Sequence, residues 1–296
     1  MANELPYHSQ LPFTFGALER DAGSFDRAGA VILPVPFERT TSYVPGTRNG
    51  PREIIAASGQ VELYDEELGR EICDVGIHTL PAMESPFAAT DDAFAEMRGV
   101  AAWLAGAGKF FIALGGEHAL TAPLVAGVAG VHPGVTVLQI DAHADLRESY
   151  MGDRHSHASA MRRVLEHAPA VQVAIRNVSS PEVAAIPGLN TTVFYDWNMR
   201  DDPAWMTRIA DALGEKVYIT IDCDGIDPAV MPAVGTPEPG GLTWRELLAL
   251  LKLVMTKKTI VAADVVELCP IPGLVAPNFL AARLVYKLIG YRFFAR

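Results

Sequence analysis

The 296-residue sequence has few cysteines and little positive charge. Its three cysteines, Cys73, Cys223 and Cys269, are far apart and form no CxxC pair, which argues against a disulfide framework or a thiolate zinc site and favours the reducing cytoplasm. Lys and Arg number 24 against 35 Asp and Glu, for a formal net charge of -11. Nucleic acids and anionic membranes are bound by clustered basic side chains, so we expect neither as a partner. A small cationic substrate suits this charge better.

The sequence also has no long apolar run, linker or internal repeat. Its first residues carry no basic region followed by an apolar core, and no apolar run is long enough to span a bilayer. Half of the residues are hydrophobic, so the chain can bury a large core. Because no break in composition divides it, we predict one domain over residues 1–296, in which residues 1–29 form an irregular N-terminal arm.

Strand and helix patterns alternate along the whole chain. Apolar runs predict strands at 30–37, 109–114, 135–140, 171–175, near Val193, at 216–221 and at 259–263. Helices are predicted at 50–58, 91–105, 119–129, 157–166, 203–213, after the capping box of Thr243, and at 278–294. The acidic run 65–67 is interpreted as a solvated face or a helix start. This alternation predicts an α/β fold of three layers, α/β/α, with a single doubly wound, mainly parallel sheet.

Four of the predicted strands end in polar clusters. These clusters are 115–118, 141–145, 222–228 and Glu267. In an open parallel α/β sheet, ligands bind at the edge formed by the carboxyl ends of the strands. We therefore expect the four clusters to meet although they are far apart in sequence.

The segment Asp141-Ala-His143-Ala-Asp145 indicates a metal site. In an extended chain, alternate residues point to the same side, so the three polar side chains can converge. Asp222 and Asp224 repeat the two-residue spacing, and the same alternation turns Cys223 away. The six candidate ligands are His118, Asp141, His143, Asp145, Asp222 and Asp224.

Four carboxylates and two imidazoles without sulfur suit Mn²⁺, with Zn²⁺, Co²⁺ or Fe²⁺ as alternatives. Six side chains are too many for one tetrahedral ion, so two ions are predicted. A water that bridges two such ions can ionise to hydroxide at neutral pH and act as a nucleophile.

Together, these motifs resemble those of the ureohydrolase family, the arginases and agmatinases. The matching segments, in order, are Gly115-Gly-Glu-His118, Asp141-Ala-His-Ala-Asp145, Ser156-His157, 222–228 and 235–243, within residues 46–267. The resemblance implies an arginase-like fold, two manganese ions per subunit, and hydrolysis of a guanidino group to urea. It also implies a homo-oligomer, a trimer or a hexamer.

The resemblance further assigns roles to single residues. It implies that His118, Asp141, Asp145 and Asp222 hold one manganese, and that His143, Asp141, Asp222 and Asp224 hold the other. Asp141 and Asp222 would then bridge the two ions, and Asp145 counts as catalytic as well as a ligand. By the same resemblance, Glu267 grips the substrate guanidinium, His157 transfers protons and contacts substrate, and Thr236 lines the site.

Two of these roles also follow from general chemistry. A carboxylate such as Glu267 can hold a guanidinium by paired hydrogen bonds. A histidine with a pKa near about 6.5 can protonate the leaving amine, and His157 competes for this role with His155, two residues earlier.

The loop between Asp145 and His157 favours agmatine as the substrate. Arginases carry a Ser-Gly-Asn type of segment just before the histidine, which holds the carboxylate of arginine. Here Asp153, Arg154 and His155 stand at that place with Ser156, and Asp153 is the predicted contact for the substrate. We therefore predict an agmatinase of polyamine biosynthesis, which forms putrescine and urea by hydroxide attack on the guanidinium carbon.

Other functions remain open at this point. A guanidinobutyrase, a guanidinopropionase or an arginase is the nearest alternative, with Arg154 as the residue that would bind a substrate carboxylate. A metal-dependent deacetylase or formimino hydrolase of the same fold would not need the carboxylate of Glu267. A non-catalytic regulatory homologue would be expected to have a broken ligand set, and the set here is complete.

Overall fold

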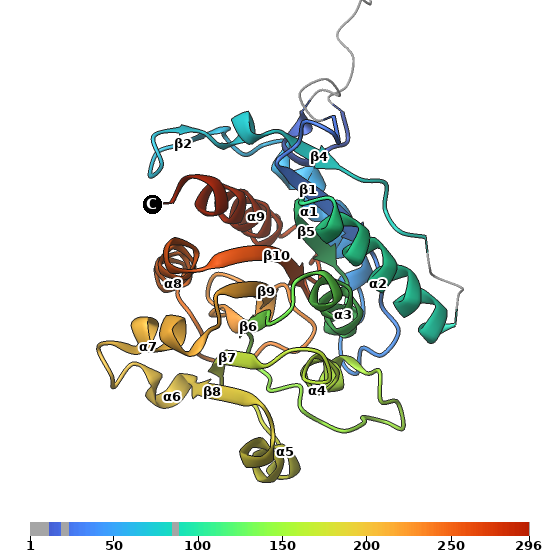
Figure 1. The fold of residues 1–296 in the computed structure, drawn as a ribbon, viewed down its shortest axis with the longest axis vertical. Coiled ribbons are helices and arrows are strands. Elements are labelled where there is room, and N and C mark those ends of the chain that lie inside the picture. The colour runs from blue at the N-terminus through green and yellow to red at the C-terminus, as the bar shows by residue number, and fades with distance from the viewer. Residues whose placement is uncertain (1–11, 19–23, 85–88, 296) are drawn as a thin grey trace, which may run out of the picture.

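The computed structural model describes residues 12–18, 24–84 and 89–295, and in them an eight-stranded sheet forms the centre (Figure 1). The strand order is β4-β1-β5-β10-β9-β6-β7-β8, and every neighbouring pair is parallel. The strands are β1 (Ala30–Val35), β4 (Ile77–Thr79), β5 (Phe110–Gly115), β6 (Thr136–Ile140), β7 (Ala170–Ile175), β8 (Thr191–Tyr195), β9 (Lys216–Asp222) and β10 (Thr259–Val266). The predicted single parallel sheet is confirmed.

Helices cover both faces of the sheet (Figure 1). One face carries α1 (Gly50–Ser58), α7 (Trp205–Ala212), α8 (Trp244–Lys257) and α9 (Ala276–Phe294), and the other carries α2 (Thr90–Gly106), α3 (Thr121–Val131) and α4 (Ala160–Val164). Successive strand residues point to opposite faces, so Ile32 packs in one apolar cluster and Val31 and Leu33 in the other. Both faces are therefore buried, as the continuous apolar strand runs predict.

Several short elements differ from the prediction. The predicted helix 157–166 is a 3-10 turn, His157–Ser159, followed by α4 alone. Strand β4 at the edge, the helices α5 (Ser180–Ala185) and α6 (Asp196–Met199), and the antiparallel pair β2 (Tyr64–Asp65) and β3 (Arg70–Glu71) have no counterpart in the prediction. These elements have two to six residues, which is too short for a period of 2 or 3.6 to stand out.

The N-terminal arm is described only in part, since residues 1–11 and 19–23 of the predicted arm lie outside the described residues. In the described part, Phe15 is buried and its backbone N–H donates to Thr79 Oγ1 at 2.9 Å. The N–H of Gly16 donates to Ser58 Oγ at 2.8 Å. This portion of the arm thus packs on the body of the protein.

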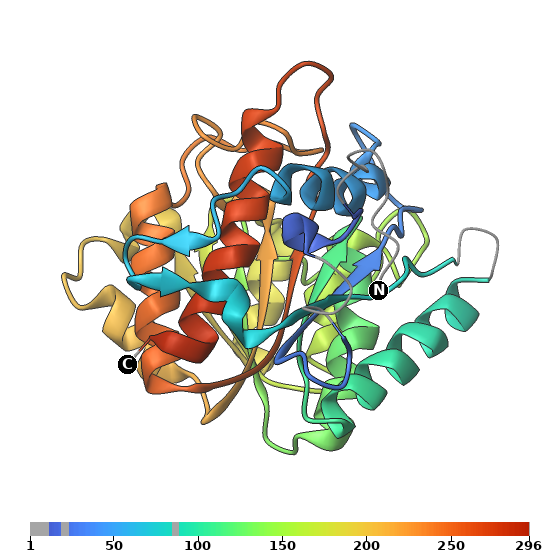
Figure 2. The ribbon, with the colours of Figure 1, turned by 90° about the horizontal axis from the view of Figure 1, so that it is seen from above.

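Contrary to the prediction, the acidic run 65–67 starts no helix and only Glu66 is well exposed, because Asp65 and Glu67 both pair with Lys287. Asp65 is 0% exposed and its carboxylate lies 2.8 Å from Nζ of Lys287, itself 3% exposed on α9. Glu67 also binds Lys287, at 2.9 Å, and accepts a hydrogen bond from Tyr291. These contacts hold the β2–β3 pair against α9, and Figure 2 shows the ribbon of this pair in front of the helices α8 and α9. The sequence gives no signal of this pairing because the partners are more than 200 residues apart.

No helix in the described residues combines the length and hydrophobicity needed to cross a bilayer.

The Asp65–Lys287 pair provides a test of the fold. Replacing Asp65 with Asn leaves the buried ammonium of Lys287 without its closest carboxylate, so we expect the free energy of unfolding to fall by about 3 kcal/mol. The matched control is Glu66→Gln, because Glu66 is a neighbouring carboxylate whose side chain is 76% exposed; we expect a change within about 0.5 kcal/mol. Urea denaturation measures both values, and equal effects of the two substitutions would contradict the assignment.

Candidate active site

The four polar clusters follow four adjacent strands of the sheet. In the order β5-β10-β9-β6, these strands lead into His118, Glu267, Asp222 and Asp141. The register keeps their ends level, because Leu114 pairs with Val265 and Ile140 with Ile221. β9 and β10 come last in the sequence but lie between β5 and β6, and this crossover brings residues 118, 141, 222 and 267 to one edge, as predicted.

His118 faces three carboxylates. Its Nδ1 lies 3.0 Å from Asp141, 3.3 Å from Asp145 and 3.3 Å from Asp222. In the described part of the chain this buried Nδ1 has no hydrogen-bond partner. The ligand atoms of His118, Asp141 and Asp222 all lie within 4.8 Å of one another. A divalent cation fits this group, because it would bind the free imidazole nitrogen and neutralise the carboxylates.

A second group adjoins the first. Asp141, His143 and Asp224 also bring their ligand atoms within 4.8 Å of one another, and Nδ1 of His143 is 2.9 Å from Asp224. Asp141 belongs to both groups, which supports its predicted bridging role. Asp222 belongs only to the first, so its bridging role remains a prediction. Cys223, between the two aspartates, is buried in an apolar cluster and turned away as expected.

Hydrogen bonds from the backbone and from Thr220 fix the orientation of these side chains. The backbone N–H of His143 donates to Asp141 Oδ1 at 2.6 Å, and that of Ala142 donates to Asp224 Oδ1 at 3.0 Å. Behind His118, Nε2 lies 2.8 Å from the hydroxyl of Thr220. Because Nε2 is engaged in this contact, Nδ1 is the nitrogen left to face the carboxylates.

The site concentrates negative charge in a buried volume. Burial, and then the neighbouring carboxylates Asp224 and Asp141, raise the pKa of Asp222 well above its usual range. Burial and Asp141 raise the pKa of Asp145 to about 7. Carboxylates that resist ionisation in this way gain most from a bound cation, and the N/O donor set without sulfur fits two divalent ions.

Two site residues have left-handed backbone conformations. The φ angle is +52° at Asp145 and +63° at Glu267, a region that costs about 1–3 kcal/mol for residues other than glycine. At Glu267 the surrounding hydrogen bonds hold this conformation: its N–H donates to Gly116 O at 2.8 Å, and its Oε1 accepts from the N–H of His118 at 2.7 Å.

Position 116 requires glycine, because the Cβ of any other residue would lie 2.0 Å from the carbonyl oxygen of Phe37.

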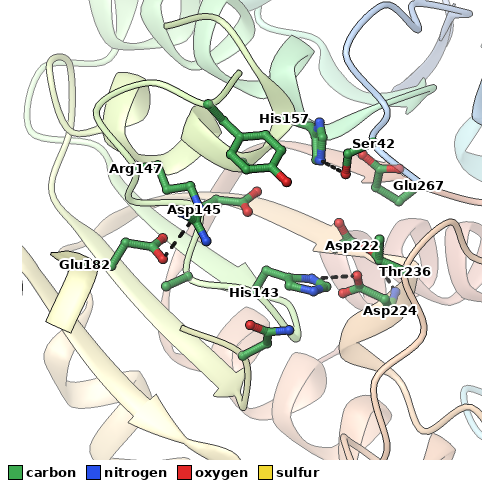
Figure 3. Close-up of a pocket in the computed structure, with 14 residues that line it drawn as sticks. Ser42, His143, Asp145, Arg147, His157, Glu182, Asp222, Asp224, Thr236 and Glu267 are labelled. Carbon is green, nitrogen blue, oxygen red and sulfur yellow. Dashed lines mark hydrogen bonds and ion pairs between the residues drawn. The ribbon is translucent and has the colours of Figure 1, made fainter. Parts of the chain in front are cut away.

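A cavity of about 190 Å³ opens above the ligand groups. Figure 3 shows Glu267, Ser42 and His157 on one side of it, and Arg147 and Glu182 on the opposite side, with Asp145 and His143 between them. Glu267 is 9% exposed, and burial followed by the charge of Glu117 raises its pKa well above its usual range. The predicted residues His157, Glu267 and Thr236 all line this cavity.

Asp153 and Arg154, by contrast, lie outside the lining. The carboxylate of Asp153 accepts the N–H of His155 at 2.7 Å within its own turn, and the exposed Arg154 pairs with Glu166 at 3.0 Å. This geometry does not support the predicted substrate contact of Asp153. His155 lies 3.5 Å from Asp91 and does not line the cavity. Of the two histidines considered for proton transfer, only His157 lines it.

Five polar residues of the lining were not predicted from the sequence: Ser42, Arg147, Tyr150, Asn177 and Glu182. Arg147 lies 3.9 Å from Glu182, and its guanidinium stands 5.1 Å from the centre of the Tyr150 ring. Arg147 and Tyr150 follow the candidate ligand Asp145 closely in sequence, and this proximity could have predicted that they line the site. Ser42 comes from the loop after β1 and Glu182 from α5, and nothing in their sequence context places them here.

His157 differs from its expected protonation behaviour. Burial, and then the positive charges of His143 and His118, lower the pKa of His157 to about 4, below the value near 6.5 that the sequence argument assumes. His157 is therefore neutral at pH 7. It can accept a proton, and once protonated it releases that proton readily.

The chain is similar to known proteins along most of its length. A model of the arginase family matches residues 28–290. The N(1)-aminopropylagmatine ureohydrolase of Synechocystis is 43% identical, over 96% of this chain and 97% of that protein. The agmatinase of Bacillus anthracis is 33% identical, over 84% and 86%. The crystal structure of the agmatine ureohydrolase of Thermoplasma volcanium superposes with a TM-score of 0.84 at 30% identity, over 91% of this chain and 92% of that one.

The shared position of Asp141 gives a prediction about metal content. We expect the Mn²⁺-loaded protein to hold about two ions per chain, Asp141→Asn to lose both, and His143→Ala to lose only one, because Asp141 alone belongs to both groups. Elemental analysis after gel filtration measures the ratio. The control is the exposed Asp201→Asn, which should keep both ions. Two retained ions in Asp141→Asn would contradict a bridging role.

Proposed function

The chain belongs to the arginase family, and on that premise we propose that it hydrolyses the guanidino group of agmatine, or of a close derivative of agmatine, to urea and an amine. The observation that carries this proposal is the buried carboxylate of Glu267, which faces the cavity beside two groups of divalent-ion ligands. A buried carboxylate is well suited to bind a guanidinium, because two parallel N–H···O bonds and opposite charges combine there.

Each side chain then has a definite task. Glu267 accepts hydrogen bonds from the guanidinium and holds its carbon over the ligand groups, with Thr236 on the cavity wall. His157 takes up a proton as water adds to that carbon, and it passes the proton to the departing amine. We propose Mn²⁺ as the metal: when bound, two such ions lower the pKa of water and stabilise negative charge in the transition state.

The far end of the substrate lies toward Arg147 and Glu182. Glu182 accepts hydrogen bonds from the N–H groups of Leu146 and Ser179, both at 2.9 Å, and pairs with Arg147 only at 3.9 Å. Arg147 would attract a carboxylate and would repel an ammonium unless Glu182 offsets it. Arg147, rather than Arg154, is thus the residue that would favour a guanidino acid, which remains the nearest rival substrate.

A second candidate substrate is agmatine with an aminopropyl extension. Identity to the relative named for N(1)-aminopropylagmatine is 43%, against 33% for the named agmatinase. Loss of urea from this compound leaves a triamine, whereas agmatine leaves putrescine. Either product fits a role in polyamine biosynthesis.

A urea assay decides among the substrates. The Mn²⁺-loaded protein is given agmatine, N(1)-aminopropylagmatine, arginine, guanidinobutyrate and guanidinopropionate, and we expect the highest kcat/KM with one of the first two. A preference for a guanidino acid, lost in Arg147→Gln, would replace the agmatine assignment. No urea from any of them, with polyamine binding intact, would favour a regulatory homologue.

The role of Glu267 gives a separate prediction. Glu267→Gln removes the charge that pairs with the guanidinium, so we expect kcat/KM to fall on the order of 100-fold or more, equivalent to about 3 kcal/mol. The exposed Glu66→Gln is the control and should retain full activity. Metal content and Tm of both variants are measured alongside. Nearly unchanged turnover would favour the deacetylase or formimino hydrolase interpretation, in which no guanidinium is held.

A further inference from the structure

Glu117 is a buried carboxylate to which neither the sequence motifs nor the proposed mechanism gives a role. It is 0% exposed and lies between Gly116 and His118, at the end of β5. Its Oε2 accepts the backbone N–H groups of Arg39 and Thr40, each at 2.6 Å, and its Oε1 accepts the Thr40 hydroxyl at 2.9 Å. Glu117 therefore fixes both the position of the loop after β1 and the direction of one hydroxyl.

Thr40 connects Glu117 to His157. Its Oγ1 accepts the backbone N–H of His157 at 2.9 Å and lies 3.1 Å from Nδ1 of the same histidine. The only other described contact of Nδ1 is Ser156 Oγ at the longer distance of 3.4 Å. On the other side of the ring, Nε2 lies 3.5 Å from Ser42 Oγ, which lines the cavity.

The positions of the hydrogens on Thr40 and His157 follow from the number of donors and acceptors around the Thr40 hydroxyl. The Thr40 hydroxyl has one proton, and it donates this proton to Glu117 Oε1, while two backbone N–H groups occupy Oε2. Thr40 Oγ1 can then interact with His157 Nδ1 only by accepting a proton from it. The proton of a neutral imidazole is thereby placed on Nδ1, and the lone pair is left on Nε2.

We propose that Glu117, acting through Thr40, is a positioning residue that holds neutral His157 in the Nδ1–H tautomer, with Nε2 open to the cavity as a proton acceptor. Neither Glu117 nor Thr40 needs to touch the substrate. The tautomer itself does not depend on the reaction, but its catalytic consequence rests on the proposed function. In that reaction His157 accepts the proton at Nε2 first and then returns it to the amine from the same atom, so no ring rotation is needed.

Glu117→Gln tests the proposal because it should reverse the tautomer. The two backbone N–H groups at Oε2 require the amide oxygen of Gln at that position, so the NH₂ group must point to Thr40 and donate to it. The Thr40 proton then turns to His157 Nδ1 and the imidazole proton moves to Nε2. Thr40→Val removes the link, and Thr40→Ser keeps it and serves as the matched control.

Magic-angle-spinning NMR of the ¹⁵N-histidine protein, loaded with diamagnetic Zn²⁺, reads the protonated nitrogen directly. His157→Gln identifies the signal among the eight histidines. We expect Nδ1–H in the wild type and in Thr40→Ser, and Nε2–H in Glu117→Gln. A wild-type His157 protonated on Nε2, or a Glu117→Gln spectrum unchanged from the wild type, would overturn the proposal.

Kinetics supply the second readout. With the substrate that the urea assay selects, we expect kcat of Glu117→Gln and Thr40→Val to fall about 10- to 100-fold at nearly unchanged KM, which is part of the roughly 10²–10⁴-fold that acid–base catalysis provides in full. Thr40→Ser should restore most of kcat. Metal content is measured in each variant, since Glu117 adjoins His118. If no guanidino compound is hydrolysed, the proposed function fails, and the NMR result still decides the tautomer.

Discussion

Burial of several carboxylates at one edge of the sheet is the constraint on which the rest of this structure depends. Asp141, Asp222 and Asp224 are each at most 3% exposed, and charges so placed are costly unless cations and hydrogen bonds compensate them. Backbone N–H groups supply part of the compensation, and the imidazoles of His118 and His143 direct a nitrogen to the same points. The remaining need for positive charge suits this edge to divalent cations and, beside them, to the cationic guanidino substrate that we propose.

The backbone conformation around the site places the buried carboxylates where they are needed. Gly116 allows β5 to pass against the end of β1, and from there Glu117 and His118 project in different directions, one toward the loop after β1 and the other toward the ligands. The left-handed conformation of Glu267 turns its carboxylate from the direction of β10 into the cavity. The surrounding hydrogen bonds offset the cost of that conformation, and the carboxylate is thereby held in place before any substrate binds.

Polar groups behind the ligands link the site to the core. His118 contacts Thr220, which lies 3.4 Å from Thr121, and Thr121 in turn donates to the buried Asp264 at 2.9 Å. Tyr218 donates to the same carboxylate at 2.7 Å. These residues come from β9, β10 and α3, so the orientation of His118 depends on elements that also form the sheet and its helical cover.

The sequence by itself determined the parallel α/β architecture and the choice of six candidate ligand residues, because alternating apolar runs and strand-end pairs such as Asp141 and His143 are local patterns. Only the tertiary structure decided that β9 and β10 lie between β5 and β6, that Arg147 and not Arg154 reaches the cavity, and that Asp65 is buried against Lys287. It also lowered the pKa of His157 and joined Glu117 to it through Thr40. The physical reason is the same in each case: burial, charge and hydrogen bonding at these residues come from segments distant in sequence, and no local pattern records which segments will meet.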